Sequence, residues 1–197
     1  MRNIIILLLL SLGLLFSVTS CKQSTAESTT PNTTTLQPQA KPTITSQKKP
    51  ATAKPGADSP INWMTFEEAQ AAMKNEPKKL FVDVYTYWCG PCKMLDRNTF
   101  SNPQLAEFVN ENYYAVKFNA QDENDIVFGG KTFSNPNYDP AKGQYRRNSS
   151  NQLAGAMGVR AFPTMVILNE QLQIMHSLRG YKTPQQLQPV LEQYAKI

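Results

Sequence analysis

The chain has 197 residues and a formal net charge of +5 at pH 7, and only three of its residues are cysteines. Three cysteines are too few for a disulfide-stapled scaffold, so a hydrophobic core must hold the fold together. Residues 61–197 contain 14 lysines and arginines against 13 acidic residues, and this balance gives no support to nucleic acid as a partner.

The first twenty residues are organised like an export signal. Arg2 precedes an apolar stretch from Ile4 to Phe16, which is shorter than the roughly 20 residues that a membrane-spanning helix needs. The stretch ends in Val18-Thr19-Ser20-Cys21, which resembles the lipobox of bacterial lipoproteins. We therefore predict a signal peptide at 1–20 and lipidation of Cys21, with the protein anchored to a membrane of the cell envelope and facing the periplasm or the cell surface. An ordinary secretory signal with an incidental cysteine is the alternative.

Residues 21–60 are rich in Thr, Pro, Ser, Gln and Lys and poor in large aliphatic side chains. Such a segment buries too little apolar surface to offset the entropy that folding costs. We predict a disordered tether here, followed by one folded domain over residues 61–197.

The domain is predicted to open with a helix and a buried strand. Thr65 and Glu68 have the spacing of a capping box, and the helix that they begin should end before Pro77. Residues 79–87 then alternate as a strand with Leu80, Val82 and Val84 on one face and Phe81, Asp83 and Tyr85 on the other. Apolar residues on both faces are typical of a central strand in an α/β sheet.

Two cysteines follow this strand, at the start of a helix predicted over 92–97. An exposed thiol at a helix N-terminus faces unpaired N–H groups and the positive end of the helix dipole, and both favour the reactive thiolate. Cys89 and Cys92 therefore indicate thiol–disulfide exchange. Half of a zinc site is an alternative, although zinc takes four ligands and His176 is the only histidine. A structural disulfide is another, although it would close a very small loop and stabilise little.

The middle of the chain predicts a helix, a strand and a long irregular segment. Asn102 can cap a helix that begins at Pro103, and residues 113–119 alternate as a strand. This strand and the first one should pair in parallel. Residues 121–150 fit no regular element, and a loop of about thirty residues is usually functional or disordered. Because it leaves the sheet at the same edge as Cys89, we hypothesise that it shapes partner selection.

The C-terminal part predicts four elements: a short helix over 151–157, a strand over 164–168, a strand over 172–178 that pairs with it in antiparallel fashion, and a helix from residue 183. Pro189 falls inside the last helix and removes one backbone hydrogen bond, so we expect a kink or a later start.

The order of these elements resembles thioredoxin over residues 61–197. The most specific block is Val82–Lys93, which reads VDVYTYWCGPCK. Residues 99–104 are more similar to the periplasmic C-terminal domain of DsbD-type thiol reductases. The resemblance implies an α/β, thioredoxin-like fold in which helices flank a central mixed sheet, with an insert at about 121–150.

The resemblance also implies the roles of the site residues. Cys89 would be the attacking cysteine and Cys92 the buried resolving one. Asp83 would be the buried acid that takes a proton from Cys92, with Lys117 as its neighbour. No metal is expected, and the Cys89–Cys92 redox-active disulfide would be the only redox group.

Further residues are implied to bind substrate. Trp88, Gly90 and Pro91 would surround the cysteines, with Pro91 helping to set the redox poise. Pro163 matches the cis-proline that aligns a substrate backbone, and Phe162 stands before it where thioredoxins usually have isoleucine.

The predicted function is that of a protein-disulfide reductase, an oxidoreductase of the bacterial cell envelope. Its partners would be disulfide-containing envelope proteins and a membrane thiol reductase that supplies electrons, while a lipid anchor attaches it to the membrane. Two alternatives stay open. One is a disulfide oxidase or isomerase, and the other is a non-catalytic, membrane-tethered thioredoxin-like binding module.

Overall fold

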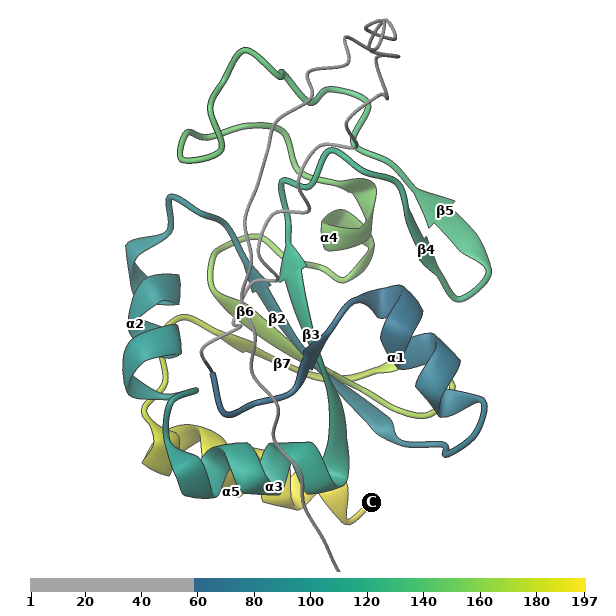
Figure 1. The fold of residues 1–197 in the computed structure, drawn as a ribbon, viewed down its shortest axis with the longest axis vertical. Coiled ribbons are helices and arrows are strands. Elements are labelled where there is room, and N and C mark those ends of the chain that lie inside the picture. Colours follow the sequence, from purple (N-terminus) through teal and green to yellow (C-terminus); the bar gives the residue numbers. More distant parts are fainter. Residues whose placement is uncertain (1–58) are drawn as a thin grey trace, which may run out of the picture. The chain divides into compact units, whose positions relative to one another are not determined.

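A mixed sheet of five strands organises residues 59–197, the part of the chain that the computed structural model describes (Figure 1). The predicted signal peptide, Cys21 and nearly all of the predicted tether lie outside these residues. The strand order is β1-β3-β2-β6-β7, with β1 at Trp63–Met64, β2 at Lys79–Tyr85, β3 at Tyr113–Asn119, β6 at Thr164–Leu168 and β7 at Ile174–Arg179. Strands β1, β3 and β2 are parallel, and β6 and β7 pair in antiparallel fashion.

Five helices connect or cover these strands within the described residues: α1 at Phe66–Met73, α2 at Gly90–Asn98, α3 at Pro103–Asn112, α4 at Gln152–Ala156 and α5 at Pro184–Ala195. The predicted capping box is present, since Glu68 N–H donates to Thr65 Oγ1 and Thr65 N–H donates to Glu68 Oε2. Asn102 caps α3 as predicted. None of these helices has the length and apolar character needed to cross a bilayer.

The two faces of the sheet carry two separate hydrophobic cores. On one face, Phe81 of β2 packs with residues from α2, α3 and α5, including Leu95, Leu105 and Leu187. In Figure 1, α1, α4 and a hairpin lie over the other face. Residues of these elements form a second core with Leu80, Val82 and Val84 of β2. Strand β2 is therefore buried on both faces, which confirms the prediction from its residue pattern.

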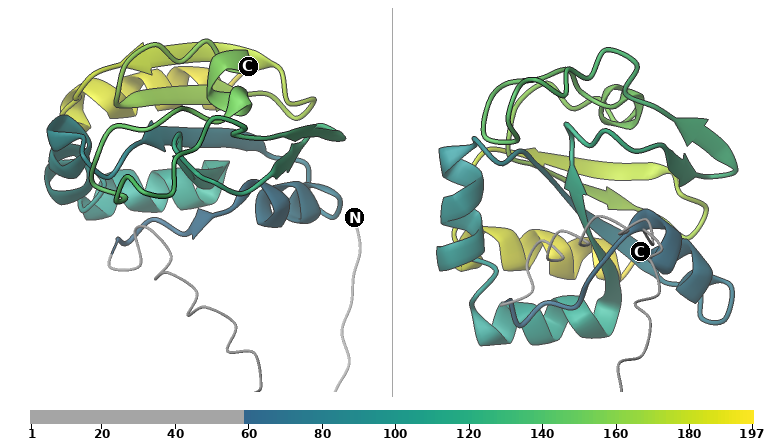
Figure 2. Two further views of the ribbon diagram at one scale, coloured as in Figure 1. Left: turned by 90° about the horizontal axis from the view of Figure 1, so that it is seen from above. Right: turned by 45° about the horizontal axis from the view of Figure 1, so that its top comes forward.

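The hairpin lies inside the segment that the sequence assigned to no element. Strands β4, at Ile126–Phe128, and β5, at Lys131–Phe133, pair in antiparallel fashion and pack on α1, where the rings of Phe66 and Phe128 are 5.1 Å apart. The rest of the segment, residues 134–150, is irregular, and we call it the distal loop. Figure 2 shows it extending beyond the end of β3.

Both ends of this segment are fixed by hydrogen bonds. Asn151 N–H donates to the carbonyl oxygen of Ala120 at 2.7 Å, so the chain returns to the point from which it left the sheet. Nearer the tip, Asn135 Nδ2 donates to the Ser149 carbonyl oxygen at 3.0 Å, and Ser149 Oγ donates to Asn135 Oδ1 at 2.7 Å. The two ends of the distal loop are thus joined by side-chain hydrogen bonds, next to the point where the backbone is bonded to the end of β3.

Several predicted boundaries differ from the observed ones. The strand predicted over 79–87 ends at Tyr85, because the chain turns where Cys89 N–H donates to the Thr86 carbonyl oxygen at 3.1 Å. The helix predicted from residue 92 begins at Gly90, and the strand predicted from 172 begins at Ile174.

The last helix also corrects an expectation. The later start suggested for it is wrong, since α5 begins at Pro184 and runs through Pro189. Its start is fixed by Thr183 N–H, which donates to Gln186 Oε1 at 3.0 Å. A proline removes only one backbone donor, and the helix tolerates that loss.

Candidate active site

The two cysteines lie at the N-terminus of α2. Their sulfur atoms are joined in a disulfide, and Cys89 is the N-cap residue, with Gly90 and Pro91 in the first two helical positions. Cys92 N–H donates to Cys89 Sγ at 3.1 Å. A sulfur in this position would gain from both the N–H donor and the helix dipole once it is a thiolate. Both cysteines are buried, with exposed fractions of 3% for Cys89 and 1% for Cys92.

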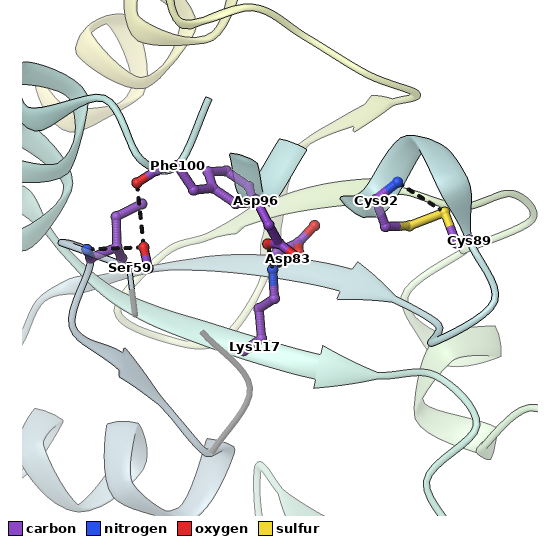
Figure 3. Close-up of polar contacts among 8 residues, drawn as sticks. Ser59, Asp83, Cys89, Cys92, Asp96, Phe100 and Lys117 are labelled. Atoms are coloured by element: carbon purple, nitrogen blue, oxygen red, sulfur yellow. Dashed lines mark hydrogen bonds and ion pairs between the residues drawn. A yellow bond between two sulfur atoms is a disulfide. The ribbon is translucent and has the colours of Figure 1, made fainter. Parts of the chain in front are cut away.

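A buried ion-pair network lies below this helix (Figure 3). Lys117 Nζ of β3 lies 2.7 Å from Asp83 Oδ2 of β2, and it also donates to Asp96 Oδ1 of α2. The Asp83 side chain is fully buried and that of Lys117 is 3% exposed, whereas that of Asp96 is 42% exposed. Lys117 thus links a carboxylate of the core to one that solvent reaches.

Aromatic rings enclose the charged end of Lys117. Its Nζ lies 4.8 Å from the centre of the Trp63 ring, 5.1 Å from Tyr85 and 4.9 Å from Phe100. Such rings attract a cation through their quadrupole while they exclude water. The enclosure therefore holds the ammonium group of Lys117 in place and away from water.

Burial governs the protonation of Asp83. Desolvation raises its pKa above the ordinary value of 3.8, and this effect outweighs the opposing attraction of Lys117. Within residues 59–197, Asp83 Oδ1 has no hydrogen-bond partner, which is consistent with that desolvation. For Lys117, burial alone would lower the pKa, but the two carboxylates raise it overall. The lysine therefore keeps its proton while Asp83 is available to exchange one.

The predicted substrate-binding residues meet on the other side of the cysteines. The ring of Phe162 lies edge-on to Trp88 at 5.8 Å, and both pack against the cysteine pair. The peptide bond between Phe162 and Pro163 is cis. Strand β6 begins directly after it, with Thr164 paired to Val84 of β2. Pro163 therefore lies directly before the inner strand β6, next to Phe162 that packs on the dithiol, and it offers no N–H to a neighbouring strand.

The inserted segment also reaches the site. Trp88 Nε1 donates to Gln121 Oε1 at 2.6 Å, and Gln121 Nε2 donates to the carbonyl oxygen of Asn148 in the distal loop. The guanidinium carbon of Arg147 lies 4.6 Å above the centre of the Trp88 ring. On the neighbouring residue, Tyr87 packs edge-on against Tyr145 at 5.9 Å. The distal loop is thus fastened to the two residues that precede Cys89.

Sequence reasoning missed three of these residues. Asp96 could have been found, because it lies four residues after buried Cys92 and so shares its helix face. Gln121 and Arg147 had no local signal, since their contacts depend on how the insert folds back. From the sequence, Tyr145 is only one of the aromatic residues of the insert, for which packing and binding are equally favoured. His176 is not part of this site and stacks instead on Tyr194 at 4.9 Å.

Comparison with known proteins assigns the family. Residues 66–195 match the thioredoxin-like domain family. The chain belongs to this family. Its members share a fold rather than one substrate, so membership agrees with oxidoreductase chemistry at the cysteine pair and leaves its direction and partners open.

Individual relatives are distant. An uncharacterised protein of Archaeoglobus fulgidus is 31% identical over 71 residues, which cover 36% of this chain and 56% of that protein. Other curated relatives, from Caenorhabditis elegans and rat, are matched over about a tenth of their length. A thioredoxin from Thermus thermophilus is 15% identical with a TM-score of 0.50, over 68% of this chain and 86% of that one, and it supports the fold. The DsbD C-terminal domain of Neisseria meningitidis is 17% identical with a TM-score of 0.43, over 64% and 90% of the two chains.

Proposed function

We propose that this protein is a thiol–disulfide oxidoreductase that reduces disulfides in proteins of the bacterial cell envelope. The observation that carries the proposal is the bonded Cys89–Cys92 pair at the start of α2, packed against Trp88 and Phe162. A cysteine pair in this position can cycle between dithiol and disulfide. Pro163 cannot donate a backbone hydrogen bond, which leaves the position before β6 open for pairing with a partner's backbone.

The reaction transfers two electrons in two exchanges. The Cys89 thiolate attacks one sulfur of the partner disulfide, which forms a mixed disulfide and releases the other partner sulfur as a thiolate that takes up a proton. Cys92 then loses its proton and attacks Cys89 Sγ, which releases the second partner thiol. The partner leaves as a dithiol, and the protein is left with the Cys89–Cys92 disulfide. A dithiol on a membrane thiol reductase would return it to the reduced form.

Asp83 supports the second exchange. Because burial raises its pKa, its carboxylate is a stronger base than an exposed one and can accept the proton that Cys92 loses. Lys117, which stays charged, joins Asp83 to Asp96, whose side chain solvent reaches. No cofactor other than the cysteine pair takes part in this scheme.

The location in the envelope is proposed from the sequence. The lipobox-like segment that ends in Cys21 supports lipidation, and the composition of residues 22–60 supports a tether between membrane and domain. Replacement of Cys21 by serine should abolish incorporation of a labelled fatty acid into the protein without loss of insulin reduction. Equal labelling of the serine variant would contradict lipidation of Cys21.

Insulin reduction tests the chemistry. The pre-reduced protein should precipitate the insulin B chain in the presence of dithiothreitol, and Cys89→Ser should abolish this activity. Cys92→Ala should instead accumulate mixed disulfides with envelope proteins, which mass spectrometry would identify. If Cys89→Ser retained the activity of the unmodified protein, the proposed role of the pair would be wrong.

A further inference from the structure

Three cations from three separate segments lie on, or close in the chain to, the residues that form the dithiol site. Lys93 follows Cys92 on α2, Arg147 lies on Trp88, and Arg160 precedes the Phe162–Pro163 peptide. All three are exposed. We propose that this cation rim selects partners whose disulfide is flanked by acidic residues. The inference rests on the proposed function and adds the class of substrate to it.

Arg147 is the best positioned of the three. Its guanidinium lies on the Trp88 ring at 4.6 Å, and the hydrogen bond from Gln121 to the neighbouring Asn148 carbonyl fixes the backbone beside it. A stacked guanidinium is held by its face, while the N–H donors at its edge remain available to a carboxylate. Trp88 adjoins Cys89 in the chain, so Arg147 lies close to the attacking cysteine. A partner carboxylate bound by Arg147 would therefore belong to a residue next to the partner's own cysteine.

Lys93 belongs to the same aromatic cluster. Its Nζ lies 5.7 Å from the centre of the Tyr145 ring, which is 63% exposed and packs in turn against Tyr87. Lys93 and Arg147 thus place two cations over the rings of Tyr145 and Trp88, beside the residues that precede Cys89.

These cations are not neutralised from within the domain. Within the described residues, none of Lys93, Arg147 and Arg160 forms an ion pair with a carboxylate. The nearby cavity of about 600 Å³ differs in this respect, because both Lys142 and Arg146 and the acids Asp122 and Glu123 line it. The lining of the cavity is close to charge balance, whereas Lys93, Arg147 and Arg160 have no carboxylate partner within the described residues. Charge complementarity at such a surface raises association rates and selects partners.

The test uses two cyclic disulfide peptides that differ only in the residues beside their cysteines, glutamate in one and glutamine in the other. Each kcat/KM is divided by the rate at which neutral dithiothreitol reduces the same peptide, which removes differences in intrinsic reactivity. The normalised ratio should favour the glutamate peptide about three- to tenfold, as expected for two or three exposed ion pairs. It should approach one in about 0.5 M salt, where the Debye length is about 4 Å.

Variants in which glutamine replaces a cation show which residues cause the preference for the glutamate peptide. In the triple variant Lys93→Gln, Arg147→Gln and Arg160→Gln the ratio should fall to about one, and circular dichroism would verify that the variant is folded. Lys131→Gln, an equal charge change on the hairpin of the same insert, should keep the wild-type ratio. A ratio near one in the wild-type protein, or an unchanged ratio in the triple variant, would overturn the inference.

The design separates the inference from the proposed function. Reduction of the glutamine peptide reports the function alone, whereas the ratio reports the cation rim. If neither peptide is reduced, the proposed function fails, and the rim is then tested by binding of the S-methylated peptides, followed through Trp88 fluorescence with Trp88→Phe as the blank. Equal affinity for the two peptides would reject the rim, and tighter binding of the glutamate peptide would support it.

Discussion

Lys117 Nζ lies 2.7 Å from Asp83 Oδ2 and at the same time donates to Asp96, so one buried cation is shared by two carboxylates from different elements. The single positive charge of Lys117 is therefore shared between the carboxylates of Asp83 and Asp96. Asp83 is completely buried, and desolvation raises its pKa despite the attraction of Lys117, while the negative charge of Asp96 adds a smaller increase.

This relationship predicts how stability depends on pH. In the unfolded chain Asp83 has its ordinary pKa of 3.8, and in the folded protein the pKa is higher, so the folded state binds more protons between the two values. The free energy of unfolding of the oxidised wild-type protein, measured relative to Asp83→Asn, should therefore fall as pH rises. The slope should reach about 1.4 kcal/mol per pH unit within that window. Urea unfolding at a series of pH values measures this slope, and Glu107→Gln is the control at an exposed carboxylate. If the free energies of unfolding of wild type and Asp83→Asn changed in parallel with pH, the raised pKa would be contradicted.

Asp96→Asn should change the pH dependence of catalysis. Asp96 repels charge on Asp83 and competes for Lys117, so its removal lowers the pKa of Asp83. The rise in the rate of insulin reduction with pH should therefore occur at lower pH in the variant. Glu107→Gln removes a carboxylate from the exposed face of α3 and should leave the profile in place. An unshifted profile for Asp96→Asn would show that this residue is structural only.

Gln121→Ala should loosen the distal loop. The side chain accepts from Trp88 Nε1 and donates to the Asn148 carbonyl oxygen, and alanine would leave both without these partners. Amide hydrogen exchange over residues 138–148 should accelerate about tenfold, which corresponds to roughly 1.4 kcal/mol for the lost hydrogen bonds. Gln144→Ala, in the same loop but exposed, is the matched control. Equal exchange rates in the two variants would mean that the other contacts of the distal loop hold it in place without Gln121.

Phe100→Ala should cost the most stability. Phe100 is fully buried, and its ring contacts Trp63 at 5.1 Å and Phe81 at 6.0 Å. Removal of such a ring destabilises a core by about 3–5 kcal/mol. Val127→Ala, at a site that is 47% exposed, should cost less than about 1 kcal/mol. Urea unfolding at neutral pH compares the two, and a similar loss in both would show that the core around Phe100 can collapse to fill the space.

The sequence predicted what local patterns determine. Strand β3 agrees with its predicted bounds, because Tyr114, Val116 and Phe118 alternate with the residues of the other face. Asp83 could be singled out, since a carboxylate in an apolar strand must be buried with a partner. The contact between Arg147 and Trp88 could not, because it joins two loops whose meeting depends on the whole insert. The hairpin at residues 126–133 was hidden for a related reason, since its strands are short and only Ile126 is buried.

The bonds between Asn135 and Ser149 have an evolutionary consequence. They close the base of the distal loop, so the residues between them can be replaced or exchanged among relatives without any change in the path of the sheet or of α2. On the proposed function, electron transfer would reside in the cysteine pair of α2 and part of the partner contact in the distal loop. The two can then diverge independently, and one redox core can serve different clients through different loops.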